Sequence, residues 1–250
     1  MSYSPEYLAS DVKGAWAIAK KDLEIYYVKP NIYISGILFP LFMLLAFAVG
    51  RAAPLVSLVP GLIAITALFS ASSIEPVSVP IERRTRTFDR LLSAPVSMFS
   101  IVLGESISGF MFSGSICFLL FIPGVILYQP ALISIAILVL GIILSCFAFA
   151  SFGTVFAAYP TENVGEVMSL LNLIRLPLIF ISGVFIPLES MPLWGQTVAI
   201  ISPLTYASDI LRFGFEGTTH FGPWTDLLML VVFAIIFQVL GNFLYRKFNI

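Results

Sequence analysis

The stretch Ile81-Glu-Arg-Arg-Thr-Arg-Thr-Phe-Asp-Arg-Leu-Leu-Ser-Ala-Pro95 decides how the chain folds, because it separates two long apolar segments. Its four arginines fall within eight positions and are mixed with two acids. Charge at this density is too costly to leave in hydrocarbon, so both flanking segments must return to water here. Thr87 can cap a short helix, and Pro95 can end it. Three apolar residues share one face of that helix: Phe88, Leu91 and Leu92. The alternative is a solvated loop between two spans.

The composition assigns the chain to the membrane proteins. Of its 250 residues 59% are hydrophobic and 11% are charged, whereas soluble domains carry about 25% charged residues. Long apolar runs cross a bilayer as helices, so we expect an all-α, polytopic fold with residues 1–250 forming one transmembrane domain. Cys117 and Cys146 lie alone in separate apolar segments and are expected to be packing residues. No cleavable leader is expected, because acids precede the first apolar run.

The hydropathy pattern predicts six transmembrane helices, since a span needs about 20 apolar residues. Their approximate limits are residues 32–49, 56–79, 101–127, 131–156, a fifth span that ends near Ile186, and 227–243. Four prolines inside these spans are expected to kink or break their helices: Pro60, Pro76, Pro123 and Pro177.

Two further segments are predicted to lie at the membrane surfaces. Residues 10–29 form an amphipathic interfacial helix that Ser10 could cap, with aromatic residues such as Trp16 on one side and lysines on the other. Residues 187–223 are divided by prolines and glycines into two apolar pieces, 193–201 and 204–215. Both pieces are too short to cross, so they are expected to be interfacial or re-entrant helices on the outer side.

The basic residues set the orientation of the six spans. Ten of them fall on one side: Lys13, Lys20, Lys21, Lys29, Arg83, Arg84, Arg86, Arg90, Arg246 and Lys247. Arg51 and Arg212 fall on the other side. Positive residues favour the cytoplasmic side, so we expect both termini and residues 81–97 to be cytoplasmic.

Three ionisable residues lie within the predicted spans: Glu75, Glu105 and Arg175. A charge at this depth avoids lipid, so each is a candidate for the translocation pathway. Arg175 has two interpretations. It could attract an anionic substrate group, or it could form an internal ion pair with Glu105 on the neighbouring span.

Three blocks of sequence, in order, resemble the type-2 ABC-transporter permeases, an export class. The first is Pro60-Gly61, and the second is Glu82-Arg83 with Thr87, Leu91-Leu92 and Pro95. The third runs from Ser182-Gly183-Val184-Phe185-Ile186-Pro187 through Pro192 and Pro203-Leu204-Thr205-Tyr206 to Arg212. The family often has glycine before the threonine of the second block, where this chain has Arg86. A turn with positive φ at Arg86 would be strained.

The resemblance implies a transport subunit with no nucleotide site of its own, and no phosphate-binding loop is present in the sequence. ATP and Mg²⁺ would bind to two copies of a partner ATPase subunit. The pathway would form with a second permease copy or a sister permease in the inner (cytoplasmic) membrane. No catalytic residue, metal, bound cofactor or nucleic-acid partner is expected for this chain.

The resemblance also implies roles for particular residues. Residues 81–97 would be a cytoplasmic coupling segment, with Phe88, Leu91 and Leu92 as buried contacts to the ATPase. Polar residues would surround them: Glu82, Arg83, Arg84, Arg86, Thr87 and Arg90. Residues 187–223 would be an external gate, with these residues of the third block at its edge: Ser182, Gly183, Pro187, Pro203 and Arg212.

Two other classes are alternatives. An ion-coupled secondary transporter often has buried carboxylates and inverted repeats, and here only Glu75 and Glu105 are candidates. An intramembrane hydrolase is disfavoured, because His220, the only histidine, lies outside the spans. The transported substrate does not follow from the sequence.

Overall fold

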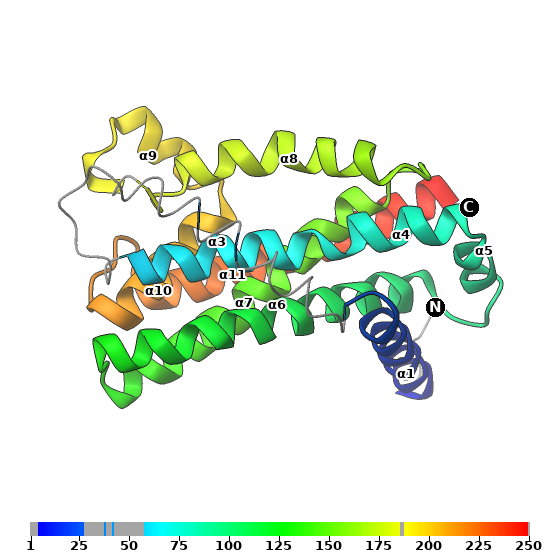
Figure 1. Cartoon of the computed structure of the whole chain (residues 1–250), viewed down its shortest axis with the longest axis horizontal. Coiled ribbons are helices and arrows are strands. Elements are labelled where there is room, and N and C mark those ends of the chain that lie inside the picture. The colour runs from blue at the N-terminus through cyan, green and yellow to red at the C-terminus, as the bar shows by residue number, and fades with distance from the viewer. Residues whose placement is uncertain (1–4, 28–37, 39–41, 43–57, 186–187, 250) are drawn as a thin grey trace.

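The computed structural model describes residues 5–27, 38, 42, 58–185 and 188–249. All regular structure within these ranges is helical (Figure 1). The N-terminal helix α1, Pro5–Asp22, continues as a π-helical turn, η1, Leu23–Tyr27. The remaining elements follow in order: α3 Val59–Ser72, α4 Ile74–Arg84, α5 Thr87–Leu92, α6 Met98–Tyr128, α7 Leu132–Ala157, α8 Val164–Ile181, η3 Leu188–Ser190, α9 Leu193–Ala199, α10 Pro203–Glu216 and α11 Pro223–Asn249.

Five helical stretches of the described chain are long and apolar enough to span a membrane. They are Val59–Arg84, Met98–Tyr128, Ile133–Ala157, Val164–Ile181 and Pro223–Phe248. These match the last five predicted spans, so the prediction of an all-helical polytopic membrane protein is confirmed. The first predicted span, 32–49, lies outside the described residues apart from two isolated positions.

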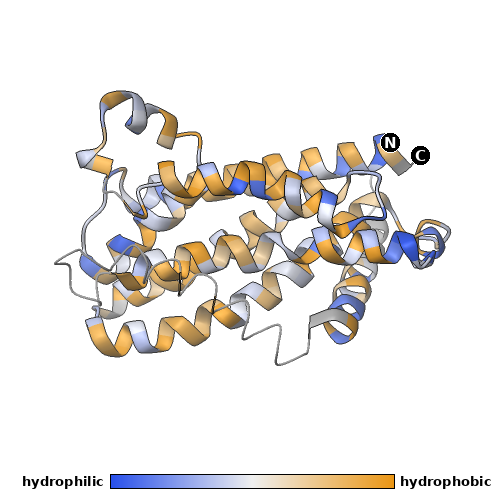
Figure 2. Ribbon diagram, turned by 45° about the horizontal axis from the view of Figure 1, so that its top comes forward, coloured by the Kyte–Doolittle hydropathy of each residue, from blue (hydrophilic) through white to orange (hydrophobic). Residues whose placement is uncertain are grey.

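Polar residues gather at the two ends of the bundle, and apolar residues cover its middle (Figure 2). The short helix α5 and the C-terminus share one end, and α1 lies across the bundle close to them (Figure 1). The short helix α9 and the C-terminal end of α10 lie toward the opposite end (Figure 1). The five long helical stretches run between these two polar ends, which is the arrangement expected of a protein that crosses a bilayer.

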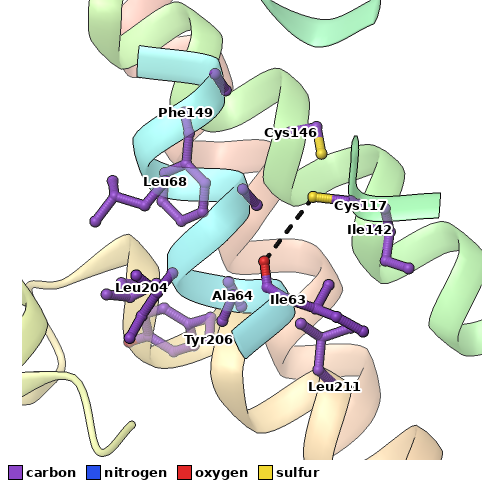
Figure 3. Packing of buried hydrophobic residues seen from close by; sticks show 14 of the residues in the cluster. Ile63, Ala64, Leu68, Cys117, Ile142, Cys146, Phe149, Leu204, Tyr206 and Leu211 are labelled. Atoms are coloured by element: carbon purple, nitrogen blue, oxygen red, sulfur yellow. Dashed lines mark hydrogen bonds between the residues drawn. The ribbon is translucent and has the colours of Figure 1, made fainter. Parts of the chain in front are cut away.

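Helix α7 lies at the centre and packs against α3, α6, α10 and α11. The core between them contains both cysteines, which are free and buried (Figure 3). The Cys117 thiol donates to the Ile63 carbonyl at 3.9 Å. The prediction that Cys117 and Cys146 are packing residues is therefore confirmed.

Helix α1 differs from its prediction. It begins at Pro5, so Ser10 lies inside the helix and does not cap it. Its buried face consists of Ala15, Ile18 and Ala19, whereas 53% of Trp16 is exposed. The reason is close packing against α6, where a Cβ on Gly104 would lie 2.6 Å from the Ala15 carbonyl oxygen. Small residues allow this approach, so Ala15 and Ala19 face the bundle and Trp16 does not.

The predicted break near Pro76 is confirmed, since α3 ends at Ser72 and α4 begins at Ile74. The other three prolines do not break their helices. Pro60 lies in the first turn of α3, where no intrahelical donor is lost. Pro123 and Pro177 lie inside α6 and α8, which continue through them.

The two short outer pieces are confirmed as the helices α9 and α10. Eleven of the fourteen residues of α10 are buried, because it packs against α3, α7 and α11. Helix α10 is therefore part of the bundle, and α9 lies outside it.

Candidate functional site

The polar stretch that separates the first two described spans folds as a helix end, a turn and a short helix. α4 ends at Arg84, and the amides of Thr85 and Arg86 donate to carbonyls of its last turn. Arg86 then adopts φ 60°, in the left-handed region. This is the position at which the resembled family often has glycine. The expected strain at Arg86 is therefore present, and it sets the direction in which α5 leaves α4.

The prediction that Thr87 caps the short helix is wrong. The residue before α5 is Arg86, and it makes no side-chain cap. The Thr87 hydroxyl points back and donates to the Glu82 carbonyl at 3.2 Å. The left-handed turn brings these two groups together, so Thr87 fastens the start of α5 to the end of α4.

Arg83 is turned into the protein. Its guanidinium donates to the backbone carbonyls of Tyr159, Ala157 and Ala158, at the end of α7. The cation also lies 5.2 Å from the centre of the Phe88 ring. A positive charge at a helix C-terminus satisfies carbonyls that have no intrahelical partner. Arg83 thus ties the end of α4 to the α7–α8 turn.

Phe88 is also internal, with 1% of its surface exposed. It packs in a cluster with Ile101, Val102 and Tyr245, and the ring centres of Phe88 and Tyr245 are 6.3 Å apart. A side chain in this position holds α5 against the bundle. Its burial does not fit the interpretation that Phe88 contacts a partner. We therefore correct its role: Phe88 is the seat of α5, the buried side chain that packs α5 against the bundle.

The surface left for a partner is charged. Arg84, Arg86, Asp89 and Arg90 are exposed, and Arg86 and Asp89 form an open ion pair of 3.6 Å. Beside them is an open groove of about 200 Å³ between α5 and the α7–α8 turn, with Leu92 among its lining residues. Small-molecule sites usually measure about 300–1,000 Å³, so this groove suits a protein side chain better than a ligand.

Helix α1 is joined to the same end of the bundle by an ionic cluster that was not predicted from the sequence. The Lys21 ammonium lies 2.5 Å from the Glu82 carboxylate and 3.0 Å from Asp22. These two carboxylates raise the pKa of Lys21, although its burial opposes them. Burial raises the pKa of Asp22 to about 6, and Lys21 counters part of that rise. Glu82 is therefore an internal partner of α1 and not an exposed docking residue.

Arg175 does not pair with Glu105, so that interpretation is wrong. It is 2% exposed and reaches from α8 to the α3–α4 break, where it donates to Ser73 at 2.8 Å and Ser72 at 3.2 Å. It also donates to Asn172 at 2.5 Å and lies 4.0 Å from the centre of the Phe69 ring. The hydroxyl groups of two serines at the break thus accept the hydrogen bonds that the carboxylate of Glu105 was expected to accept.

Glu105 is bonded on another side of the bundle. Its carboxylate accepts a 2.6 Å hydrogen bond from the Tyr245 hydroxyl of α11. Glu75 on α4 is fully buried, and neither of its oxygens accepts a hydrogen bond in the described part of the chain. The three predicted pathway residues thus form two separate groups, with the acids on one side and Arg175 on the other.

At the opposite end, the structure brings several residues of the third sequence block together. Arg212 of α10 donates to the Gly183 carbonyl at 2.7 Å, and Ser208 donates to the Ser182 carbonyl at 3.1 Å. Gly183 has φ 79°, a conformation that favours glycine. Pro203 opens α10, and Pro187 lies outside the described residues.

The same end contains acids that sequence reasoning missed. Asp209 is buried in α10 and accepts hydrogen bonds from Thr219 and from the amides of His220 and Phe221, which closes the loop before α11. Asp226, in the first turn of α11, is completely buried. The signal available in the sequence was the presence of an acid inside each apolar stretch.

Comparison with known proteins adds the family context. A family model described as ABC-2 type transporter matches residues 14–215. The protein ycf38 of Cyanophora paradoxa, whose name describes a transport permease, is 28% identical over 243 residues, which cover 88% of this chain and 83% of ycf38. The inner membrane transport permease YhhJ of Escherichia coli is 28% identical over 171 residues, 66% of this chain and 45% of YhhJ.

A third relative is the daunorubicin resistance ABC transporter permease protein DrrB1 of Streptomyces coeruleorubidus. It is 35% identical over 104 residues, which cover 40% of this chain and 34% of DrrB1. The aligned part is thus most of ycf38 but less than half of YhhJ and DrrB1.

Proposed function

The chain belongs to the ABC-2 type transporter family, and we propose that it forms the translocation pathway of an ATP-driven exporter together with a second permease chain. As a member of this family it is a multi-pass membrane permease and not itself an enzyme. ATP would be hydrolysed by two copies of a separate ATPase subunit. Both termini would lie on the cytoplasmic side, in keeping with the distribution of basic residues.

The observation that carries this proposal is the construction of the α4–α5 turn. Arg83 anchors the turn to α7, Phe88 seats α5 on Tyr245, and Lys21 anchors α4 to α1. A force applied to α5 is therefore transmitted to three other helices without a flexible loop between them. Such a rigid connection is what a subunit needs if it receives mechanical work from another chain.

The contact with the ATPase would be made by the exposed residues around α5. Arg84, Arg86 and Arg90 present positive charge, and the groove beside Leu92 is large enough to receive a side chain of the partner. Charged rims set the orientation and rate of docking more than its strength. Phe88 would act indirectly, by holding this surface in place.

At the outer end, we propose that α9 and α10 act as the external gate. The bonds from Arg212 and Ser208 fix α10 to the end of α8, so movement of α8 would carry α10 with it. Drug-like substrates are one candidate class, because the name of DrrB1 describes daunorubicin resistance.

The test is ATP turnover after reconstitution with the candidate ATPase in liposomes. Phe88→Ala is expected to reduce permease-dependent stimulation of ATP turnover more than Arg90→Ala does, because α5 loses its seat. Truncating a buried aromatic costs about 3–5 kcal/mol, whereas a rim charge costs about 1 kcal/mol or less. If Phe88→Ala does not fold, the milder variant Phe88→Leu can be used for the same measurement of ATP turnover.

The matched control is Phe243→Ala on α11, where 60% of the side chain is exposed. It should leave stimulation unchanged. A larger loss for Arg90→Ala than for the Phe88 variants would contradict the proposed role of the seat. If the wild-type permease did not stimulate the ATP turnover of any candidate ATPase, the proposed function would be contradicted.

A further inference from the structure

Glu75 occupies a closed position among three helices. A Cβ atom on Gly109 of α6 would lie 2.4 Å from one of its carboxylate oxygens, and a Cβ on Gly153 of α7 would lie 2.7 Å from the other. The carboxyl group therefore fills the space that two glycines leave open. Neither oxygen accepts a hydrogen bond in the described chain, and full burial of the side chain disfavours a negative charge there. An isolated buried carboxylate is strongly disfavoured relative to the neutral acid.

Glu105 lies one helical turn from Gly109 on the same face of α6, toward the α5 end of the bundle. It is 2% exposed, and its carboxylate accepts a hydrogen bond from the Tyr245 hydroxyl, at 2.6 Å. Neither Glu75 nor Glu105 forms an ion pair among the described residues. Two neighbouring acids in an apolar interior cannot both ionise at low cost. Glu105, which has the donor, is the better placed of the two to hold a charge.

The charges on the surrounding helices do not compensate these acids. In their described ranges, α3 contains no ionisable residue and α7 contains only the buried thiol of Cys146. Arg175 of α8 is directed to the serines of the α3–α4 break. The remaining groups that face the acids are Asp22 and Lys21 of α1, Glu82 and Arg83 of α4, and Tyr245 of α11. Lys21 is already shared between Asp22 and Glu82, and Arg83 is bonded to carbonyls of the α7–α8 turn.

We propose that Glu75 is a proton-binding site inside the membrane, with Glu105 and Tyr245 as the polar groups that link it to the cytoplasmic end of the bundle. A metal ion does not fit, because the glycine contacts leave no space for the several oxygen ligands that a hard cation needs. Glu75 is neutral in the closed bundle and would release its proton when water reaches it. Tyr245, which also packs on Phe88, places this site next to the seat of α5.

The test is infrared spectroscopy of the full-length chain in lipid at neutral pH. A protonated carboxyl group has a carbonyl stretch separate from the bands of a carboxylate. Wild type should show this band, and Glu75→Gln should lose it. The matched control is Glu24→Gln, which changes an acid whose side chain is 65% exposed and should remove carboxylate intensity only.

A second measurement does not depend on the folding of a variant. Labelling the glutamates of wild type with ¹³C should shift the protonated-carboxyl band, because the group belongs to a glutamate. Loss of carboxylate intensity alone in Glu75→Gln would overturn the proposal. The absence of any isotope-shifted protonated band in wild type would overturn it equally. Both results are independent of the ATPase, so they leave the proposed transport function untouched.

Discussion

Arg83 and Arg86 are three residues apart in one polar segment, yet their side chains have different roles. Arg83 donates to carbonyls at the end of α7 and is part of the protein interior. Arg86 is exposed and contributes mainly through its backbone, which is left-handed. The count of arginines predicted a polar segment between two spans, and the structure has one there. It could not distinguish these roles, because the carbonyls that bind Arg83 come from residues more than seventy positions away.

Backbone strain at Arg86 leads to a testable expectation. Arg86→Gly should be neutral or stabilising, because a left-handed conformation costs a non-glycine residue about 1–2 kcal/mol. Arg90→Gly is the control, since it introduces the same change in the right-handed helix α5, where glycine costs about 1 kcal/mol. Thermal unfolding in detergent should rank Arg86→Gly above Arg90→Gly. The reverse order would show that the side chain of Arg86 matters more than its conformation.

Among the elements, α1 depends most on contacts that a helical wheel does not reveal. It packs on α6 through small residues, and it is bonded to α4 through Lys21, Asp22 and Glu82. The sequence pattern favoured an aromatic face at the membrane surface. The structure shows in addition that α1 contacts α6 and α4 at the end where α5 lies.

The raised pKa of Asp22 makes the stability of the folded protein, with α1 packed against α4 and α6, depend on pH. Its folded pKa is about 6, above the ordinary value of 3.8, so the folded state holds the proton more tightly than the unfolded state. The associated stability is complete below about pH 4 and is lost as pH rises through 6. The difference corresponds to on the order of 3 kcal/mol, since one pKa unit is about 1.4 kcal/mol.

Thermal unfolding measured between pH 4 and pH 7 tests this expectation. Asp22→Asn should flatten the decline in stability over that range, because the neutral amide does not titrate. The control Glu24→Gln, at an exposed position on the following turn, should keep the wild-type slope. An unchanged slope in Asp22→Asn would contradict the assignment of this titration to Asp22.

For the whole molecule, the sequence was sufficient to predict the helices, because their signals are local. It was not sufficient to predict contacts between residues far apart in the chain. Apolar length predicted the described spans, and the prolines and glycines of residues 187–223 predicted two short helices. Tertiary contacts could not be predicted in this way. Arg175 donates hydrogen bonds to serines at a helix break and does not pair with Glu105. Phe88 packs against Tyr245, which lies 157 positions further along the chain.

The central claim is that α5 faces the cytoplasm and carries the surface that an ATPase subunit covers. The most direct measurement is labelling of Arg90→Cys with a membrane-impermeant maleimide, which the buried native thiols Cys117 and Cys146 should not obscure. Trp194→Cys on α9, where 71% of the native side chain is exposed, reports the opposite end. We predict that Arg90→Cys is labelled only in inside-out vesicles and is protected when the ATPase is bound, whereas Trp194→Cys is labelled only from outside. Labelling of Arg90→Cys on intact cells, or equal labelling with and without the bound ATPase, would contradict the account.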